Sequence, residues 1–259
     1  MLNFEKWHGN GNDFVIINSI EEKVKIKKSL LKKISDRNKG IGFDQFINIC
    51  LPTKDDKDFF IKFYNSDGTE AGMCLNGIRC AASYIWKNNL SPIKNINVQT
   101  KTKNLICSPK KNNNVTVLLE LPERIEHEQV KNEIRSKVKD KFYMLNIGNN
   151  HVCIKMRSIE KIDLLKIYKK LEKNIKKLDI NLSIFKQAKN CIEVRTYENG
   201  VGETLSCGSA SLCVASIFLT KKNSIKVRSM GGQLTFKNIK NKVLMSGPAN
   251  FIYKGNINE

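Results

Sequence analysis

The sequence predicts an α+β protein with two pseudo-symmetric domains from an internal duplication, each a strand-rich sheet or barrel around a central helix. The main observation is a pattern that occurs twice: Glu, three residues, Cys, five residues, Cys, one residue, Ala-Ser. It reads EAGMCLNGIRCAAS at 70–83 and ETLSCGSASLCVAS at 203–216. Three further matches follow the same order, pairing 11–17 with 148–154, 96–100 with 225–229, and 117–122 with 243–248. Matches in register over such long repeats indicate a duplication and not a solenoid.

The length of 259 residues suits two ordinary domains. The repeats place the join near 117–124, before a charged stretch. We therefore expect an N-terminal half at 1–118 that carries Cys74 and a C-terminal half at 119–259 that carries Cys207. Two equivalent thiols predict an active site in the cleft between the halves.

The first half contains short segments rich in β-branched and aromatic residues, which are typical of strands. These lie at 14–18, 45–50, 59–64, 96–100 and 115–121. Helices are predicted at 29–37 and 75–87, and the second of these begins directly after Cys74. Many strands with few helices favour α+β over a doubly wound parallel sheet.

The second half follows the same plan. Strands are predicted at 151–156, 191–197, 225–228, 233–236 and 243–246. A helix at 208–219 begins directly after Cys207. A further helix at 162–178 carries Leu165, Tyr168 and Leu171 at helical spacing, so its lysines should form a solvated face.

The formal net charge of +20 raises the question of a nucleic-acid partner. The lysines are scattered, however, and clustered arginines with interleaved aromatics are missing from the sequence. The chain also has neither an apolar signal-peptide core nor an apolar run of about 18 residues. We expect a cytoplasmic protein with a small-molecule substrate, no specific nucleic acid and no membrane partner. A homodimer is left open.

Cys74 and Cys207 are the candidate chemical residues. A helix N-terminus stabilises a thiolate, and its backbone N–H groups bind a carboxylate. The alternative is that both are packing residues, which the duplication disfavours because both copies keep Cys in the same register. Cys80 and Cys213 are expected to be small buried apolar residues.

Two such thiols could invert a carbon centre, because a thiolate on one face removes the Cα proton and a thiol on the other returns one. This chemistry needs no cofactor and no metal. The sequence has no Rossmann glycine fingerprint, no Walker loop and no Cys-x-x-Cys zinc pair. The many lysines leave a pyridoxal-binding lysine open as an alternative.

Several motifs resemble the diaminopimelate epimerase family over almost the whole chain. They are WHGNGNDF at 7–14, GFDQ at 42–45, NSDGTE at 65–70, MCLNGIRC at 73–80, GNNH at 148–151, YENGVGET at 197–204 and CGS at 207–209. The resemblance implies inversion at Cα without pyridoxal phosphate. It makes Cys74 and Cys207 the pair, with Cys207 as base toward the L-centre.

The resemblance also implies the other site residues. Substrate contacts fall on Asn12, Gln45, Asn65, Leu75, Asn76, Asn149, Asn181, Glu198, Asn199, Gly208 and Ser209. Asn181 is aligned only with a one-residue gap. His151 and Glu198 match residues that tune the cysteine pKa values, and a protonated histidine would favour a thiolate by charge.

Four positions depart from the family pattern: Leu75 and Ala210 replace glycine, Asn150 replaces proline, and Asn199 replaces arginine. The family's arginine helps to hold the distal carboxylate of diaminopimelate, which a neutral amide cannot do as well. We therefore expect an amino-acid racemase whose substrate lacks a distal carboxylate, with histidine favoured. Epimerisation of diaminopimelate or lanthionine is the close alternative, and a nucleic-acid-binding or redox dithiol protein comes last.

Overall fold

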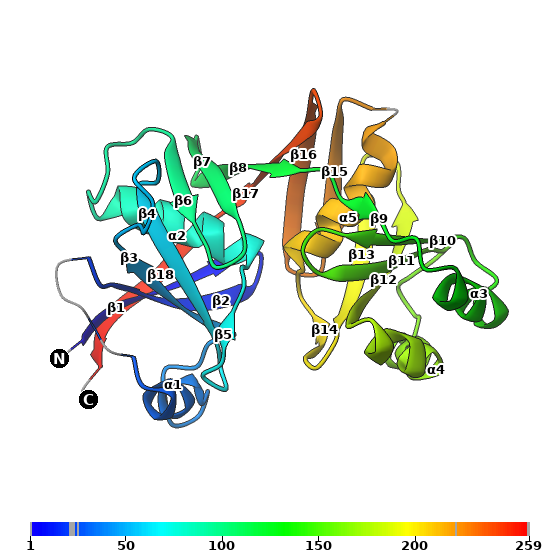
Figure 1. The fold of residues 1–259 in the computed structure, drawn as a ribbon, viewed down its shortest axis with the longest axis horizontal. Helices are drawn as coiled ribbons and strands as arrows, with labels where there is room; N and C mark the ends of the chain where they lie inside the picture. The colour runs from blue at the N-terminus through cyan, green and yellow to red at the C-terminus, as the bar shows by residue number, and fades with distance from the viewer. Residues whose placement is uncertain (1, 21–23, 25, 221, 258–259) are drawn as a thin grey trace. The chain divides into compact units, whose positions relative to one another are not determined.

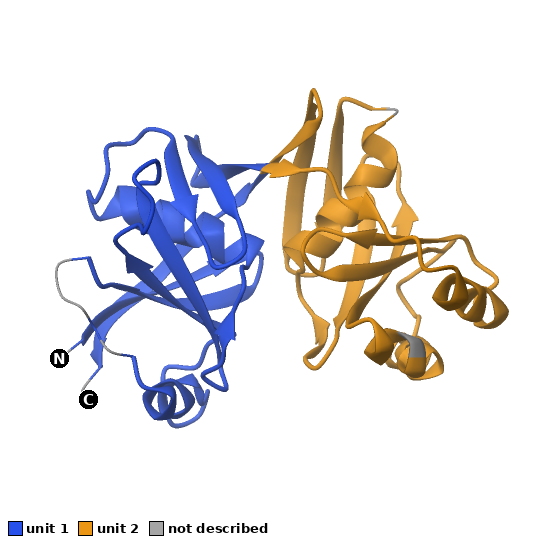
Figure 2. Cartoon of the chain, viewed as in Figure 1, with its two compact units in different colours: residues 1–118, 246–259 blue, residues 119–245 orange. Residues whose placement is uncertain are grey.

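The computed structural model describes residues 2–20, 24, 26–220 and 222–257 and divides the chain into two compact units. Unit 1 comprises residues 1–118 and 246–259, and unit 2 comprises residues 119–245 (Figures 1 and 2). The expected second half, 119–259, therefore extends too far. Its last strand, β18 (Asn250–Ile257), pairs antiparallel with β1 (Leu2–Gly9) and belongs to the sheet of unit 1.

Unit 1 is a mixed sheet that surrounds one helix. Strands β2 and β3 are parallel and are joined through α1, while β4 and β6 are parallel and are joined through β5 and α2. Its elements are β1, β2 (Asn12–Asn18), α1 (Lys28–Ser35), β3 (Gln45–Cys50), β4 (Phe59–Asn65), β5 (Glu70–Ala71), α2 (Leu75–Lys87), β6 (Ile96–Gln99), β7 (Asn104–Lys110), β8 (Asn114–Glu120) and β18.

Unit 2 repeats this topology. Strands β11 and β12 are parallel and joined through α4, and β13 and β15 are parallel and joined through β14 and α5. The shared order confirms the α+β duplication. Its elements are β9 (Glu123–Arg124), α3 (Glu128–Lys137), β10 (Phe142–Asn146), β11 (Asn150–Lys155), α4 (Leu164–Lys177), β12 (Ile180–Gln187), β13 (Ile192–Glu198), β14 (Gly202–Thr204), α5 (Gly208–Leu219), β15 (Ser224–Ser229), β16 (Gly232–Ile239) and β17 (Lys242–Pro248).

The central helices α2 and α5 begin and end at the predicted residues and are buried along most of their length. Small side chains make this close packing feasible. A Cβ at Gly77 would lie only 2.6 Å from Cε1 of Phe63, so α2 lies against the sheet at a distance that only glycine permits. The packing holds the first turn of α2, and with it Cys74, in a fixed place.

Several elements were not predicted. Helix α3 is polar apart from two buried residues, Val130 and Ile134, so its apolar period is too sparse to notice. Strands β1, β5, β7, β9, β10, β12, β14 and β18 were also missed, and β18 carries largely exposed side chains. The helices predicted at 29–37 and 162–178 are shorter in the structure. Helix α4 begins only at Leu164 because Asp163 caps it by accepting the Lys166 N–H at 3.0 Å.

Each unit has its own apolar core. In unit 1, a cluster that includes Phe4, Val15, Leu31 and Phe46 packs α1 against the strands. In unit 2, α3 and α4 cover the sheet through a cluster that includes Ile134, Leu171, Ile175 and Leu182. Among the described residues, no helix is long and apolar enough to cross a membrane.

Candidate active site

Cys74 is the residue that precedes α2, and its backbone is extended while the helix begins at Leu75. Its carbonyl accepts the Ile78 N–H at 2.8 Å, which leaves the earlier N–H groups of the first turn outside the helical hydrogen-bond ladder. The half-buried thiol lies 3.4 Å from Oδ1 of Asn12 at the start of β2. Unit 1 therefore places a thiol beside an anion-binding helix end.

Two further predicted residues, Gln45 and Asn65, lie directly opposite each other on β3 and β4. Gln45 Nε2 donates to Asn65 Oδ1 at 3.0 Å, and Asn65 Nδ2 donates to Thr69 Oγ1 at 3.1 Å. Thr69 in turn donates to Asp67 at 2.6 Å, so a carboxylate orients the whole row. Gln45 Oε1 is buried and has no hydrogen-bond partner among the described residues, which suits a ligand N–H group.

A charged cluster behind Asn12 was not predicted, although Asp44 lies inside the GFDQ motif. Arg37 donates to Asp13 and to Asp44, each at 2.8 Å, and Lys6 donates to Asp13 at 2.7 Å. Burial acts to raise the pKa of Asp13, but Arg37 and Lys6 outweigh it and lower this pKa to about 2. Asp44 accepts the Asn12 amide at 2.7 Å and so connects the cluster to the thiol.

Cys207 occupies the equivalent position in unit 2, where it precedes α5 and is buried. Its Sγ lies 3.3 Å from Oγ of Ser209, which also lies 3.1 Å from Nε2 of His151. Asn149 Nδ2 donates to the same hydroxyl at 3.4 Å. Four predicted residues of unit 2 thus meet at the Ser209 hydroxyl.

The structure specifies the environment of His151. Its side chain is fully buried, and burial lowers its pKa to about 4. The imidazole is therefore neutral near pH 7 and cannot favour a thiolate by its charge. It acts instead as a neutral hydrogen-bond partner of Ser209, and its Nδ1 has no partner among the described residues.

The remaining polar residues of unit 2 line the same end of its strands. Asn181 lies opposite His151 on the parallel strands β11 and β12. Its Oδ1 accepts the Asn199 N–H at 2.9 Å, and Glu198 accepts the Thr204 hydroxyl at 2.7 Å. Asn181 therefore lies near the start of β12, at the same end of the sheet as His151 and Glu198.

The residues around Cys74 in unit 1 and those around Cys207 in unit 2 form two half-sites. Strand register relates the positions of one half-site to those of the other. Gln45 lies opposite Phe14 in unit 1, just as Asn181 lies opposite His151 in unit 2. The Cys74 and Cys207 registers then pair Leu75 with Gly208 and Asn76 with Ser209. Leu75 is only 3% exposed, so its side chain packs inside unit 1.

Cys80 and Cys213 are fully buried, as predicted. Burial raises the pKa of the Cys80 thiol to about 12 and that of Cys213 well above its usual value. These thiols are chemically inert near neutral pH. Among the described residues, no three His, Cys, Asp or Glu side chains gather as a metal ion would require.

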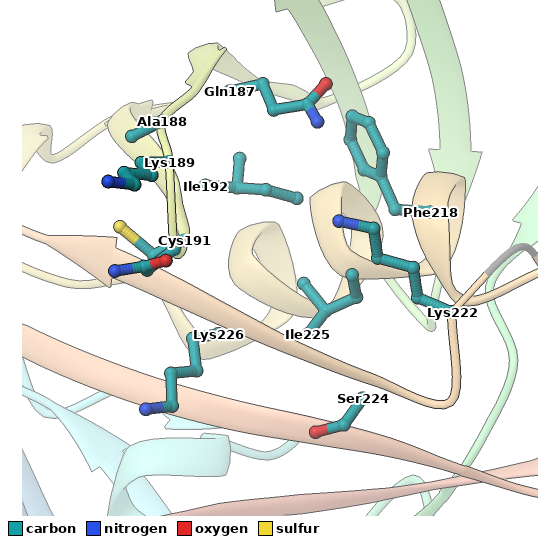
Figure 3. A pocket seen from close by; sticks show the side chains of 11 residues that line it. Gln187, Ala188, Lys189, Cys191, Ile192, Phe218, Lys222, Ser224, Ile225 and Lys226 are labelled. Atoms are coloured by element: carbon teal, nitrogen blue, oxygen red, sulfur yellow. The ribbon is translucent and has the colours of Figure 1, made fainter.

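A hollow of about 150 Å³ opens in unit 2 beside residues 187–192 and 224–226, with Phe218 and Lys222 along its wall (Figure 3). None of the predicted site residues lines it. Three of its lining residues are lysines. Neither Cys74 nor Cys207 lines it.

Paired thiols at the starts of equivalent helices, on this duplicated fold, define an isomerase of the amino-acid racemase and epimerase class. The family model described as diaminopimelate epimerase matches residues 4–125 and 143–252. The chain belongs to the diaminopimelate epimerase family.

Two relatives illustrate the similarity. The diaminopimelate epimerase of Wigglesworthia glossinidia brevipalpis is 38% identical over 290 aligned residues, which cover 99% of this chain and 100% of the relative. That of Blochmanniella floridana is 34% identical over 280 aligned residues, with the same two coverages. The similarity thus extends over both units.

Solved structures share the fold at low sequence identity. A PhzC/PhzF phenazine biosynthesis protein from Clostridium difficile superposes with a TM-score of 0.74 at 17% identity, over 100% of both chains. A hydroxyproline epimerase from Agrobacterium vitis gives 0.68 at 13% identity, over 98% of this chain and 90% of the other. At these identities the similarity is one of fold alone.

Proposed function

We propose that this enzyme epimerises diaminopimelate at Cα without pyridoxal phosphate or metal, using Cys74 and Cys207 as a thiol pair. One observation carries the proposal: each unit holds a cysteine directly before its central helix, in the same register of the same topology. Full-length relatives named diaminopimelate epimerase support the substrate.

The proposed step is a proton exchange at one carbon. The Cys207 thiolate removes the Cα proton and becomes a thiol, and the electron pair moves into the substrate carboxylate to give an enediolate. The Cys74 thiol donates its proton to the opposite face of Cα and becomes a thiolate. The N–H groups of the first turns of α2 and α5 are suited to stabilise the enediolate charge.

Unit 1 also offers an acceptor for the substrate ammonium group. Gln45 Nε2 is already committed to Asn65, and its Oε1 is buried without a hydrogen-bond partner among the described residues. An ammonium group supplies the N–H donors that this buried oxygen needs. The proposal therefore assigns Gln45 to the amino group and the helix ends to the carboxylate.

Histidine loses its support as the favoured substrate. That preference relied on Asn199, but its side chain is engaged within unit 2, where it accepts the Tyr168 hydroxyl at 2.9 Å and donates to Asp179 at 2.6 Å. The Asn199 side chain therefore has a structural role within unit 2 through these two hydrogen bonds. The relatives named diaminopimelate epimerase favour diaminopimelate as the substrate.

The test is to measure kcat/KM for LL-diaminopimelate, lanthionine and L-histidine under one condition, together with deuterium uptake at Cα from D₂O. We expect diaminopimelate to be used at least tenfold better than histidine, with no requirement for added pyridoxal phosphate. A preference for histidine would refute the substrate assignment, and full activity in Cys207→Ala would refute the thiol pair.

A further inference from the structure

In unit 1, two side-chain amides lie in a row between opposite charges. Arg79 Nη2 donates to Asn76 Oδ1 at 3.0 Å, Asn76 Nδ2 donates to Asn12 Oδ1 at 3.4 Å, and Asn12 Nδ2 donates to Asp44 Oδ2 at 2.7 Å. A guanidinium can only donate and a carboxylate can only accept. The two ends of the row therefore fix the orientation of both amides, which the amides alone would leave ambiguous.

This orientation determines what Cys74 meets. Because Asp44 takes the Asn12 NH₂ group, the carbonyl oxygen Oδ1 of Asn12 faces Cys74 Sγ at 3.4 Å. A carbonyl oxygen accepts a hydrogen bond from a thiol but offers none to a thiolate. The contact therefore stabilises the protonated form of Cys74.

The hydrogen bond from Asn12 to Asp44, which turns Asn12 Oδ1 toward Cys74, is called the clamp below. The described residues of unit 2 show no counterpart of it. The strand pairings make Asn149 the equivalent of Asn12, and they make Ile180, which precedes Asn181, the equivalent of Asp44. Cys207 lies against the Ser209 hydroxyl, which can either accept from a thiol or donate to a thiolate. The two thiols thus occupy equivalent frames with unequal partners.

Other charges near Cys74 act in both directions. Arg79 is fully buried and interacts electrostatically with Cys74, so its positive charge favours the thiolate, while a charged Cys80 would disfavour it. The Asp44 carboxylate is paired with Arg37, which is also paired with Asp13. Pairing weakens the long-range field of Asp44 but leaves its hydrogen bond to Asn12 intact.

We propose that Asp44 is a positioning residue that acts through Asn12 to keep Cys74 as the proton-bearing thiol of the resting enzyme. This role rests on the proposed epimerisation, in which Cys74 starts as the proton donor and Cys207 as the base. After one inversion Cys74 has given its proton to Cα, and Cys207 holds the original Cα proton, which it must release to solvent before the next turnover. The clamp then favours the return of a proton to Cys74 from solvent.

The test measures alkylation of each cysteine by iodoacetamide against pH, without substrate, by mass spectrometry of the two peptides. Asn12→Ala removes the acceptor while keeping the Asp44 charge, and Asp44→Asn allows the Asn12 amide to turn. We expect both to lower the midpoint of the Cys74 profile by about one pH unit, which is about a tenfold faster alkylation below the midpoint. The Cys207 profile in the same samples should not move.

Asp55→Asn is the matched control, because it removes a carboxylate from an exposed position of unit 1. It should leave both profiles unchanged, and thermal unfolding should show that all three variants are folded. An unchanged Cys74 midpoint in Asn12→Ala would overturn the proposal, even if greater access raised the plateau rate. Since no substrate is present, failure of diaminopimelate turnover would refute the proposed function and not this assignment.

Discussion

His151 and Ser209 are joined by a hydrogen bond of 3.1 Å between Nε2 and Oγ, at a hydroxyl that also contacts the Cys207 thiol. Asn149 donates to the same oxygen, which leaves the hydroxyl one lone pair and one hydrogen for its other two neighbours. When Cys207 carries its proton, Ser209 donates to a His151 protonated on Nδ1. When Cys207 is a thiolate, Ser209 donates to it and accepts from Nε2–H. The protonation of the thiol is thus coupled to the tautomer of a neutral imidazole.

This coupling predicts a role for the Ser209 hydroxyl. Ser209→Ala should lower kcat by about 10- to 100-fold, because it removes a hydrogen bond to the thiolate and leaves Nε2 without this partner. Ser209→Thr should keep most of the activity because it keeps the hydroxyl. The Cys207 alkylation midpoint should rise in the alanine variant only. Equal activity losses in both variants would show that the hydroxyl is not what matters.

The buried neutral state of His151 predicts a pH dependence of stability. Its folded pKa of about 4 lies below the unfolded value of 6.5, so the unfolded chain binds the proton more readily between these values. Stability should be fully present above pH 6.5 and should fall as the pH drops to 4, by at most about 3 kcal/mol from this residue. Urea unfolding of the wild type and of His151→Gln at several pH values measures this. The two stability curves should converge toward pH 4, and parallel curves would contradict the assignment.

The four cysteines of the repeated pattern should separate into two functional classes. Cys74→Ala and Cys207→Ala should each abolish turnover and leave the thermal midpoint nearly unchanged. Cys80→Ala and Cys213→Ala should keep turnover and lose about 1 kcal/mol of stability, because each leaves a small cavity. Deuterium uptake at Cα and thermal unfolding measure the two properties. Loss of turnover in a folded Cys80→Ala enzyme would show that burial is a poor guide to function here.

The close contact at Gly77 predicts a loss of stability when a side chain is added there. In Gly77→Ala the new methyl group would lie 2.6 Å from Phe63, so α2 must shift away from the sheet. We expect a loss of about 1–3 kcal/mol in the free energy of unfolding. Ser83→Gly, at a partly exposed position of the same helix, is a control for helix propensity and should cost less. Similar losses in both variants would indicate that the close contact at Gly77 is unimportant.

The sequence predicts best where local chemistry and apolar pattern agree. Helices α2 and α5 have the predicted bounds because small and apolar residues at helical spacing follow each cysteine. Helix α3 was missed because only Val130 and Ile134 anchor it to the core. A polar helix held by two contacts has almost no periodic signal.

The half-sites were predictable as a set of residues but not as a set of contacts. The motifs identified Asn12 and Gln45, but the bond between Asn12 and Asp44 joins residues 32 positions apart and depends on the parallel register of β2 and β3. The neutral state of His151 could not be predicted from the sequence for a related reason. Its complete burial results from packing around β11, which residue type alone does not reveal.

Because β18 pairs with β1, the first and last strands of the chain lie side by side, and unit 2 is an insertion within unit 1. During synthesis, unit 2 is complete once residue 245 has emerged from the ribosome. The sheet of unit 1 must wait for residues 250–257, which are made after all of unit 2. The unit that begins first therefore finishes last, and each new molecule passes through a stage in which β1 presents an open edge.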